Sequence, residues 1–379
     1  MKKLLTKCIS LVFVMLIALF LSGCQSLFIP RNVPVVLQEG VPSKSQSTPK
    51  ITIDSYRILC PGIVQDITSN GNSLIVLNDK NSKAPFSIDF YNTDTQELSP
   101  FISSEKRDLT ALFDTSDTGI YYVEKMNDPL SGKSGSQLLW ADINKDSTRI
   151  ISLPEENVVK YFGIGESDQV VYINNNNNIV IADNQGDRQV YSTFRNYNIL
   201  SVDFMKENNA VAFIAYDPAN EEKTNLYYAE IKTGTLELIP NLLAENVTNF
   251  DVNDINNQII FVENAMNNQN ISIWTAETAT SKIVATGNFG TGSFTPNGEK
   301  IIFTKYSPSF NSQYQSIWIM NSDGENPLQI TAPLKLNSRV MCHPFKPNLY
   351  FSVEKNAADI ISGNDSILSQ TYQVNYTIE

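Results

Sequence analysis

The chain has 379 residues and a formal net charge of −12 at neutral pH; 42% of its residues are hydrophobic and 18% are charged. These values are typical of a globular protein with a sizeable core and exclude a disordered or fibrous one. The acidic balance repels phosphate backbones and anionic head groups, which argues against nucleic acid as a partner.

The first 23 residues have the three parts of a lipoprotein signal peptide. Three lysines within the first seven residues form a basic start, and the apolar run Ile9–Phe20 is too short for a comfortable membrane span. The tetrapeptide LSGC, which ends at Cys24, resembles a bacterial lipobox. This resemblance implies that Cys24 is lipidated, becomes the mature N-terminus and anchors the chain stably. An ordinary secretory signal with a chance cysteine is the alternative.

Residues 24–50 are expected to form a lipidated, flexible tether, since they are rich in Pro, Ser and Gln without a sustained period. Loss of residues 1–23 removes three lysines and no acid, so the mature chain carries a formal charge of −15. Membrane attachment is therefore expected through the lipid alone. Gln25, not Asp, follows Cys24, which predicts an extracytoplasmic site on the cell membrane of a one-membrane bacterium or the outer membrane of a two-membrane bacterium.

Residues 51–379 repeat a pattern of short apolar runs after polar turns, with equivalent runs spaced 41 to 50 residues apart. One series of runs ends at Val76, Tyr122, Tyr172, Phe213, Phe261, Phe303 and Phe351. A second series ends at Tyr91, Ala141, Ala182, Ala229, Trp274 and Met320. Two hairpins in each period make a four-stranded antiparallel unit, which is the size of a β-propeller blade. The sequence therefore predicts an all-β propeller domain over residues 51–379.

The number of blades depends on how the ends of the chain are used. Seven first hairpins and six second hairpins are present, and a single further strand, Thr371–Ile378, follows the last of them. An unassigned strand, Ile51–Leu59, precedes the first blade. If this N-terminal strand is the outermost strand of the last blade, the ring closes with seven blades. Six blades with an appended hairpin is the alternative.

Residues 293–331 carry the most regular copy of the repeat, with a Pro-Asn-Gly turn, the strand that ends at Phe303, the strand IWIMN, an Asp323-Gly324 turn and a closing Gln-Ile-Thr. This copy resembles the WD-like repeat of TolB-type β-propellers. Members of that family also have an N-terminal α/β domain, whereas only a short tether is expected before the first blade here. The resemblance implies the fold and a tendency to bind proteins or peptides, and no partner residues are carried over.

Few residues suit catalytic or metal chemistry. His343 is the one histidine, which argues against most zinc-type sites and against a Ser-His-Asp triad; no metal ligands are assigned, and a structural role is expected for His343. Cys60 and Cys342 remain once Cys8 leaves with the signal peptide and Cys24 takes the lipid. Outside the cytoplasm they could form a disulfide, but two buried thiols that do not meet are preferred.

Four aspartates fall at similar places on the innermost strands of their blades. These are Asp66, Asp114, Asp203 and Asp251, with Asn253 and Asp254 nearby. Gathered at one mouth of the central channel, they could bind a cation such as Ca²⁺ or receive a basic peptide. The alternative, which is favoured, is that each aspartate caps its own turn.

Aromatic residues suggest two further features. Trp140, Trp274 and Trp318 fall on third strands, where packing between blades is expected. Tyr306, Phe310 and Tyr314 lie in a long connection and could form a contact patch.

Three functions remain open at this point. A non-catalytic scaffold in the cell envelope that binds a protein or peptide is preferred. The alternatives are an envelope hydrolase or lyase with a carboxylate and cation site at the channel mouth, and a capture protein for a small ligand such as a glycan. No cofactor is expected unless the aspartates bind Ca²⁺, and the oligomeric state is left open.

Overall fold

The computed structural model describes residues 51–78, 86–104, 110–127, 134–144, 147–153, 156–158, 162–192, 197–217, 220–232, 238–266, 268–307, 313–355 and 368–378. They all belong to one compact unit, Val36–Glu379. The predicted signal peptide, the tether and Cys24 lie outside the described residues. Within these ranges, no helix is long and apolar enough to cross a membrane.

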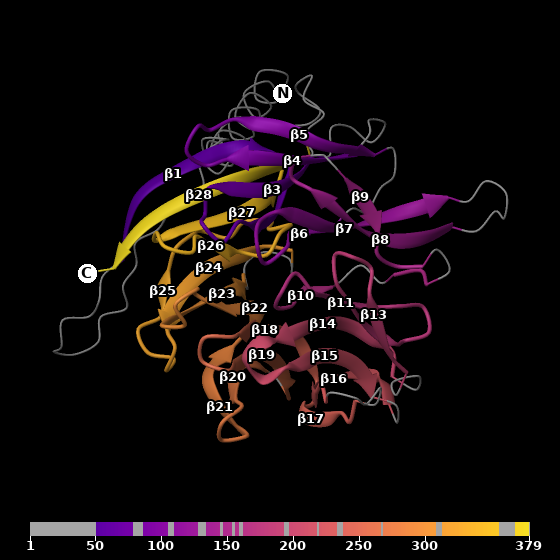
Figure 1. Cartoon of the computed structure of the whole chain (residues 1–379). Helices are drawn as coiled ribbons and strands as arrows, with labels where there is room; N and C mark the ends of the chain where they lie inside the picture. The colour runs from indigo at the N-terminus through magenta and orange to yellow at the C-terminus, as the bar shows by residue number, and fades with distance from the viewer. Residues whose placement is uncertain are drawn as a thin grey trace, which may run out of the picture. The chain divides into compact units, whose positions relative to one another are not determined.

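The unit consists of seven sheets of four antiparallel strands (Figure 1). Blades 1 and 2 comprise β2 Ile63–Ile67, β3 Ser73–Asn78, β4 Phe86–Asn92 and β5 Leu98–Ser104, then β6 Thr110–Phe113, β7 Gly119–Asn127, β8 Ser134–Asp142 and β9 Thr148–Ile150. Blades 3 and 4 comprise β10 Gly163–Ile164, β11 Val170–Ile173, β12 Ile179–Ala182 and β13 Arg188–Tyr191, then β14 Ile199–Met205, β15 Ala210–Asp217, β16 Asn220–Glu230 and β17 Asn241–Ala244, with a 3-10 turn at Lys206–Asn208. Blades 5 and 6 comprise β18 Val247–Asn253, β19 Gln258–Ala265, β20 Asn268–Thr275 and β21 Thr280–Gly287, then β22 Phe289–Phe294, β23 Lys300–Tyr306, β24 Gln315–Asn321 and β25 Leu328–Gln329.

Blade 7 is built from both ends of the chain. It contains β26 Met341–Cys342, β27 Asn348–Glu354, β28 Ser369–Ile378 and, outermost, β1 Ile51–Pro61. The indigo β1 lies beside the yellow β28 in Figure 1. The predicted seven-bladed ring, closed by the N-terminal strand, is therefore confirmed.

The core is divided among seven clusters of buried side chains, each shared by two neighbouring blades. The last cluster packs Met341 and Tyr350 of blade 7 against Val64 and Leu74 of blade 1, which closes the ring. Because each blade is covered on both faces, its central strands are apolar throughout, as the sequence predicted. The three tryptophans lie on third strands and pack in or against the clusters between blades.

The Pro-Asn-Gly motif makes the turn between β22 and β23. Thr295 N–H donates to the carbonyl of Lys300 at 2.9 Å, and the Asn297 side chain accepts from Glu299 N–H at 3.2 Å. Gly298 has φ of +71°, a left-handed conformation that glycine adopts without strain. The first turn of blade 1 is similar: Thr68 N–H donates to the carbonyl of Ser73 at 3.0 Å, and Gly71 has φ of +76°.

The turns between the first and second strands gather at one end of the ring, which we call the first-turn face. It is formed by residues 68–72, 114–118, 165–169, 206–209, 254–257, 295–299 and 343–347. Adjacent turns contact one another: Ser69 N–H donates to Asp117 at 2.9 Å, and Lys206 N–H donates to Asp254 at 2.9 Å. These contacts fix the position of the central channel mouth at this end.

Candidate functional site

The innermost strands bring three of the four predicted aspartates to the central channel. They are Asp66 on β2, Asp203 on β14 and Asp251 on β18. Each occupies the same register in its blade, opposite Ile75, Ala212 and Ile260 of the second strand, respectively. Together with Arg339 they line three adjoining cavities of about 330, 340 and 600 Å³. Arg339 lines all three, so its side chain lies where the cavities meet.

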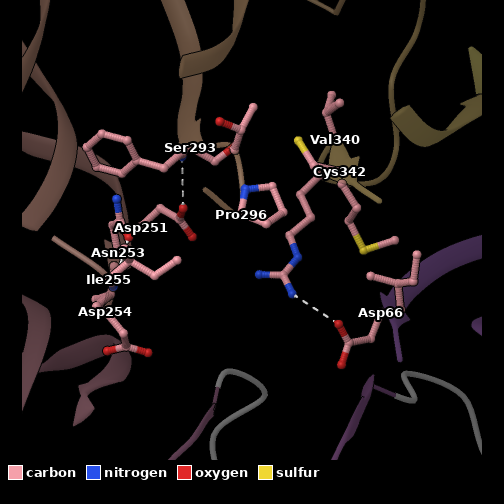
Figure 2. Close-up of a pocket in the computed structure, with 15 residues that line it drawn as sticks. Asp66, Asp251, Asn253, Asp254, Ile255, Ser293, Pro296, Val340 and Cys342 are labelled. Atoms are coloured by element: carbon pink, nitrogen blue, oxygen red, sulfur yellow. Dashed lines mark hydrogen bonds and ion pairs between the residues drawn. The ribbon is translucent and has the colours of Figure 1, made fainter. Parts of the chain in front are cut away.

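Arg339 and Asp66 form an ion pair across the junction of blades 7 and 1. The guanidinium Nη2 lies 3.8 Å from Asp66 Oδ1, drawn as a dashed line in Figure 2. The Arg339 side chain is 56% exposed and that of Asp66 is 20% exposed, so the pair is open to the channel. The other oxygen of Asp66 accepts from Phe113 N–H of blade 2 at 2.9 Å, which fixes the carboxylate in place.

Asp251 and Asp203 are held by backbone N–H groups in a similar way. Phe294 N–H of blade 6 donates to Asp251 Oδ2 at 3.3 Å, and Phe204 N–H donates to Asp203 Oδ1 at 2.9 Å. Gly163 leaves room for Asp203, because a Cβ at that glycine would lie 2.2 Å from Asp203 Oδ1. Each carboxylate is thus positioned by the scaffold while it still faces a cavity.

The channel environment disfavours ionisation of all three carboxyl groups. Burial raises the pKa of Asp203 to about 7, with repulsion from Asp251 as a second cause. Burial likewise raises the pKa of Asp251 to about 6, and that of Asp66 rises too, in both cases against the opposing effect of Arg339. A cation placed in the channel opposes this effect and favours the charged forms.

Asp114 differs from the other three. Its N–H donates to the carbonyl of Gly119, as that of Thr68 does to Ser73, so Asp114 occupies the turn position two residues later than Asp66. Its carboxylate accepts from Thr118 N–H at 2.8 Å and Trp140 Nε1–H at 3.0 Å. Asp114 thus caps its own turn, as the favoured alternative predicted, although it also borders the 340 Å³ cavity.

The channel lining is predominantly acidic. Six carboxylates and two cationic side chains line the three cavities. The acids are Asp66, Asp114, Asp117, Asp203, Asp251 and Asp254, and the cations are Lys206 and Arg339. Among the described residues, however, no three His, Cys, Asp or Glu side chains are grouped as a metal site requires.

Of the remaining predicted residues, Cys342 lines the 330 Å³ cavity, whereas His343 and Cys60 do not line any of the three cavities. His343 is 3% exposed, and its Nδ1 accepts from the N–H groups of Phe345 and Lys346, which is a structural role. Cys60 and Cys342 are free thiols, and burial raises the pKa of each to about 12. The two residues are not joined by a disulfide in this structure, and the raised pKa values disfavour the thiolate forms.

The predicted aromatic contact patch is described in part. Tyr306 ends β23 and Tyr314 precedes β24, so both lie at the end of the blade opposite the first-turn face. Phe310 lies outside the described residues. The aspartates and this patch are therefore on different faces of the propeller.

Arg339 was missed by sequence reasoning. It precedes the two-residue strand β26, so neither a strand pattern nor a motif marks it. Its position just before the innermost strand of the closing blade was the one feature of the sequence that could have placed it near the channel. Its significance depends on the ring closure that brings it to Asp66.

No protein-family model and no curated protein matches the chain. Among solved structures, an oligogalacturonate lyase in complex with manganese is similar with a TM-score of 0.62 and 10% identity, over 91% of this chain and 97% of that one. A chain of a mitotic checkpoint complex is similar with a TM-score of 0.51 and 12% identity, over 89% and 98%. TolB from Acinetobacter baumannii is similar with a TM-score of 0.47 and 13% identity, over 67% of this chain and 62% of that one, so the chain spans less than two thirds of TolB.

At these identities the similarities concern the fold alone. The described blades and the near-complete overlap with the lyase agree on a closed propeller ring. The chain is a seven-bladed β-propeller.

Proposed function

We propose that the chain is a bacterial envelope lipoprotein, anchored through Cys24, whose propeller binds a protein or peptide without catalysing a reaction. The observation that carries the binding role is the channel mouth, where six fixed carboxylates and two cations line adjoining cavities. A rigid ring that holds uncompensated charge at a cavity suits recognition of a cationic group. The anchor and the envelope location rest on the lipobox at Cys24.

Two consequences of the proposal can be tested in the native cells. Metabolic labelling with a palmitate analogue should mark the wild-type chain and not the Cys24→Ser variant. A cross-linked pull-down of the tagged chain should enrich one dominant envelope partner, with less of it recovered by Cys24→Ser. Labelling of the Cys24→Ser chain would contradict the lipid anchor. The absence of an enriched partner would contradict the scaffold role.

Purified partner then allows a direct test of the channel. The triple variant Asp66→Asn, Asp203→Asn and Asp251→Asn should bind it at least about tenfold more weakly, because the variant loses the charges that face the ligand. If the triple variant bound the partner with the same affinity as the wild type, the channel carboxylates would not contribute to binding. Asp187→Asn, an exposed carboxylate on the turn between β12 and β13, is the matched control.

An enzyme is the second candidate, and one observation favours it. A carboxyl group with a pKa of about 7, Asp203, faces a cavity of about 600 Å³, which suits general acid or base chemistry. The acidic lining, however, repels a polyanionic substrate such as an oligogalacturonate, so the substrate of the similar lyase does not transfer. Turnover of an uncharged glycan or peptide that disappears in Asp203→Asn would support this candidate over the scaffold.

A further inference from the structure

The first-turn face, at which the acidic channel opens, carries two exposed apolar side chains. Ile255, on the turn between β18 and β19, is 67% exposed and lines the same cavity as Asp251 and Asp254. Phe345, on the turn between β26 and β27, is 79% exposed. Figure 2 shows Ile255 next to Asp254 and Asn253 at one side of this cavity. Two large apolar side chains that are mostly exposed at turn tips are available for contact with another molecule.

The charge of this face selects the kind of molecule. Across the seven first turns there are seven acidic residues and two lysines. The acids are Asp114, Asp117, Glu166, Asp168, Glu207, Asp254 and Glu299, and the lysines are Lys206 and Lys346. The cavities beneath add Asp66, Asp203 and Asp251. A second copy of this chain, with its formal charge of −12 or lower, would be repelled, whereas a basic segment would be attracted.

Arg339 indicates which chemical group fits the mouth. Its guanidinium already lies among the channel carboxylates, 3.8 Å from Asp66, and remains 56% exposed. The site thus accommodates a guanidinium of its own, and the cavities on either side leave space for another cationic side chain. Arginine is well suited to this position because its planar guanidinium pairs with carboxylates and is weakly hydrated.

We propose that the first-turn face is the docking surface of the propeller, and that its occupant is a segment of a partner polypeptide in which arginine or lysine alternates with apolar residues. The cationic side chains enter the acidic mouth, while apolar side chains pack on Ile255 and Phe345. This inference rests on the proposed binding function and specifies the face and the chemistry of the partner. The opposite end, with Tyr306 and Tyr314, is not the docking surface.

The test uses the purified mature chain and a fluorescein-labelled peptide, Leu-Arg-Leu-Arg-Leu-Arg, with fluorescence anisotropy as the readout. Ile255→Ser and Phe345→Ser should each weaken binding about fivefold, because each removes apolar contact area without a change in charge. Met266→Ser is the matched control, since Met266 is fully exposed at the opposite end, on the turn between β19 and β20, and should leave affinity unchanged. A peptide with Glu in place of Arg should not bind.

Several outcomes would overturn the proposal. One is an equal loss of affinity in Met266→Ser, and another is unchanged affinity in both first-turn variants; thermal unfolding of each variant verifies that it is folded. A rise in affinity on deletion of residues 25–50 would assign the surface to the chain's own N-terminal segment, which has three basic residues and one acid. If the pull-down partner still binds both first-turn variants fully, the docking face is wrong while the binding function stands; if no partner is captured, the function itself fails.

Discussion

The imidazole of His343 in blade 7 lies directly against the backbone of Gly71 in blade 1. A Cβ placed on Gly71 would lie 2.3 Å from Cε1 of His343, and the glycine has φ of +76°. The first turns of the first and last blades therefore interlock at the point where the ring closes. The only histidine of the chain serves this junction, which accounts for its burial.

Gly71→Ala should destabilise the protein by more than backbone strain alone. Gly186→Ala is the matched control, because Gly186 also has positive φ, +91°, but open space around its Cβ position. The control should cost about 1 kcal/mol of unfolding free energy, and Gly71→Ala about 1–2 kcal/mol more, owing to the clash with His343. Chemical denaturation measures both, and equal costs would show that the contact with His343 is easily relieved.

A second junction at the ring closure is a buried chain of hydroxyl groups. Ser352 and Thr371 are fully buried; Ser352 accepts from Val64 N–H at 2.8 Å, and Thr371 donates to the carbonyl of Gly62 at 2.9 Å. Thr371→Val keeps the shape and leaves the Gly62 carbonyl without this donor, so we expect a loss of about 1–3 kcal/mol. Thr377→Val is the control on the same strand, since Thr377 is exposed and its hydroxyl donates to the exposed Asp54 at 2.7 Å. A similar loss in both variants would contradict a special role for the buried hydroxyls.

The blades were predictable from sequence because each is made of local hairpins, whose turns and apolar runs lie within one period. The ring closure was also predictable. The sequence contained one unassigned strand and one blade with three strands, and the simplest way to complete that blade is to pair β1 with β28. The sequence placed Asp66, Asp203 and Asp251 on innermost strands, but turn capping was the favoured role for each, and they accept instead from backbone N–H groups outside their own turns. Asp114 was grouped with them, although it lies two residues later in its blade than Asp66 does in blade 1. Counting residues back from the turn would have revealed this shift. Arg339 could not be found this way, because its importance comes from a contact between opposite ends of the chain.

Asp203 should make stability depend on pH. Burial and Asp251 raise its folded-state pKa to about 7, above the value of about 4 expected in the unfolded chain, so the folded state binds the proton more tightly. The stabilisation that this proton provides is fully present below about pH 4 and is lost as the pH rises through about 7. Asp203→Asn does not titrate, so its Tm should exceed that of the wild type at pH 8, and the difference should shrink towards pH 5. The charged groups that face Asp203, namely Asp251, Asp254 and Arg339, are retained in the variant, so the two proteins differ in one titratable group. A constant difference in Tm across this range would contradict the raised pKa.

Arg339 should act as the counter-ion of the channel carboxylates. It opposes the effect of burial at Asp66, Asp203 and Asp251, so its removal leaves their charged forms less favourable. Arg339→Ala should therefore shift all three titrations to higher pH, measured by ¹³C NMR of labelled aspartate carboxyl groups, whereas Arg339→Lys should keep most of the wild-type behaviour. At pH 8.5, where the carboxyl groups are largely ionised in either protein, Arg339→Ala should also bind the arginine-containing peptide more tightly, because no internal guanidinium competes for the site. Unchanged titrations together with unchanged affinity would mean that Arg339 is a solvent-exposed bystander and that the channel carboxylates act without it.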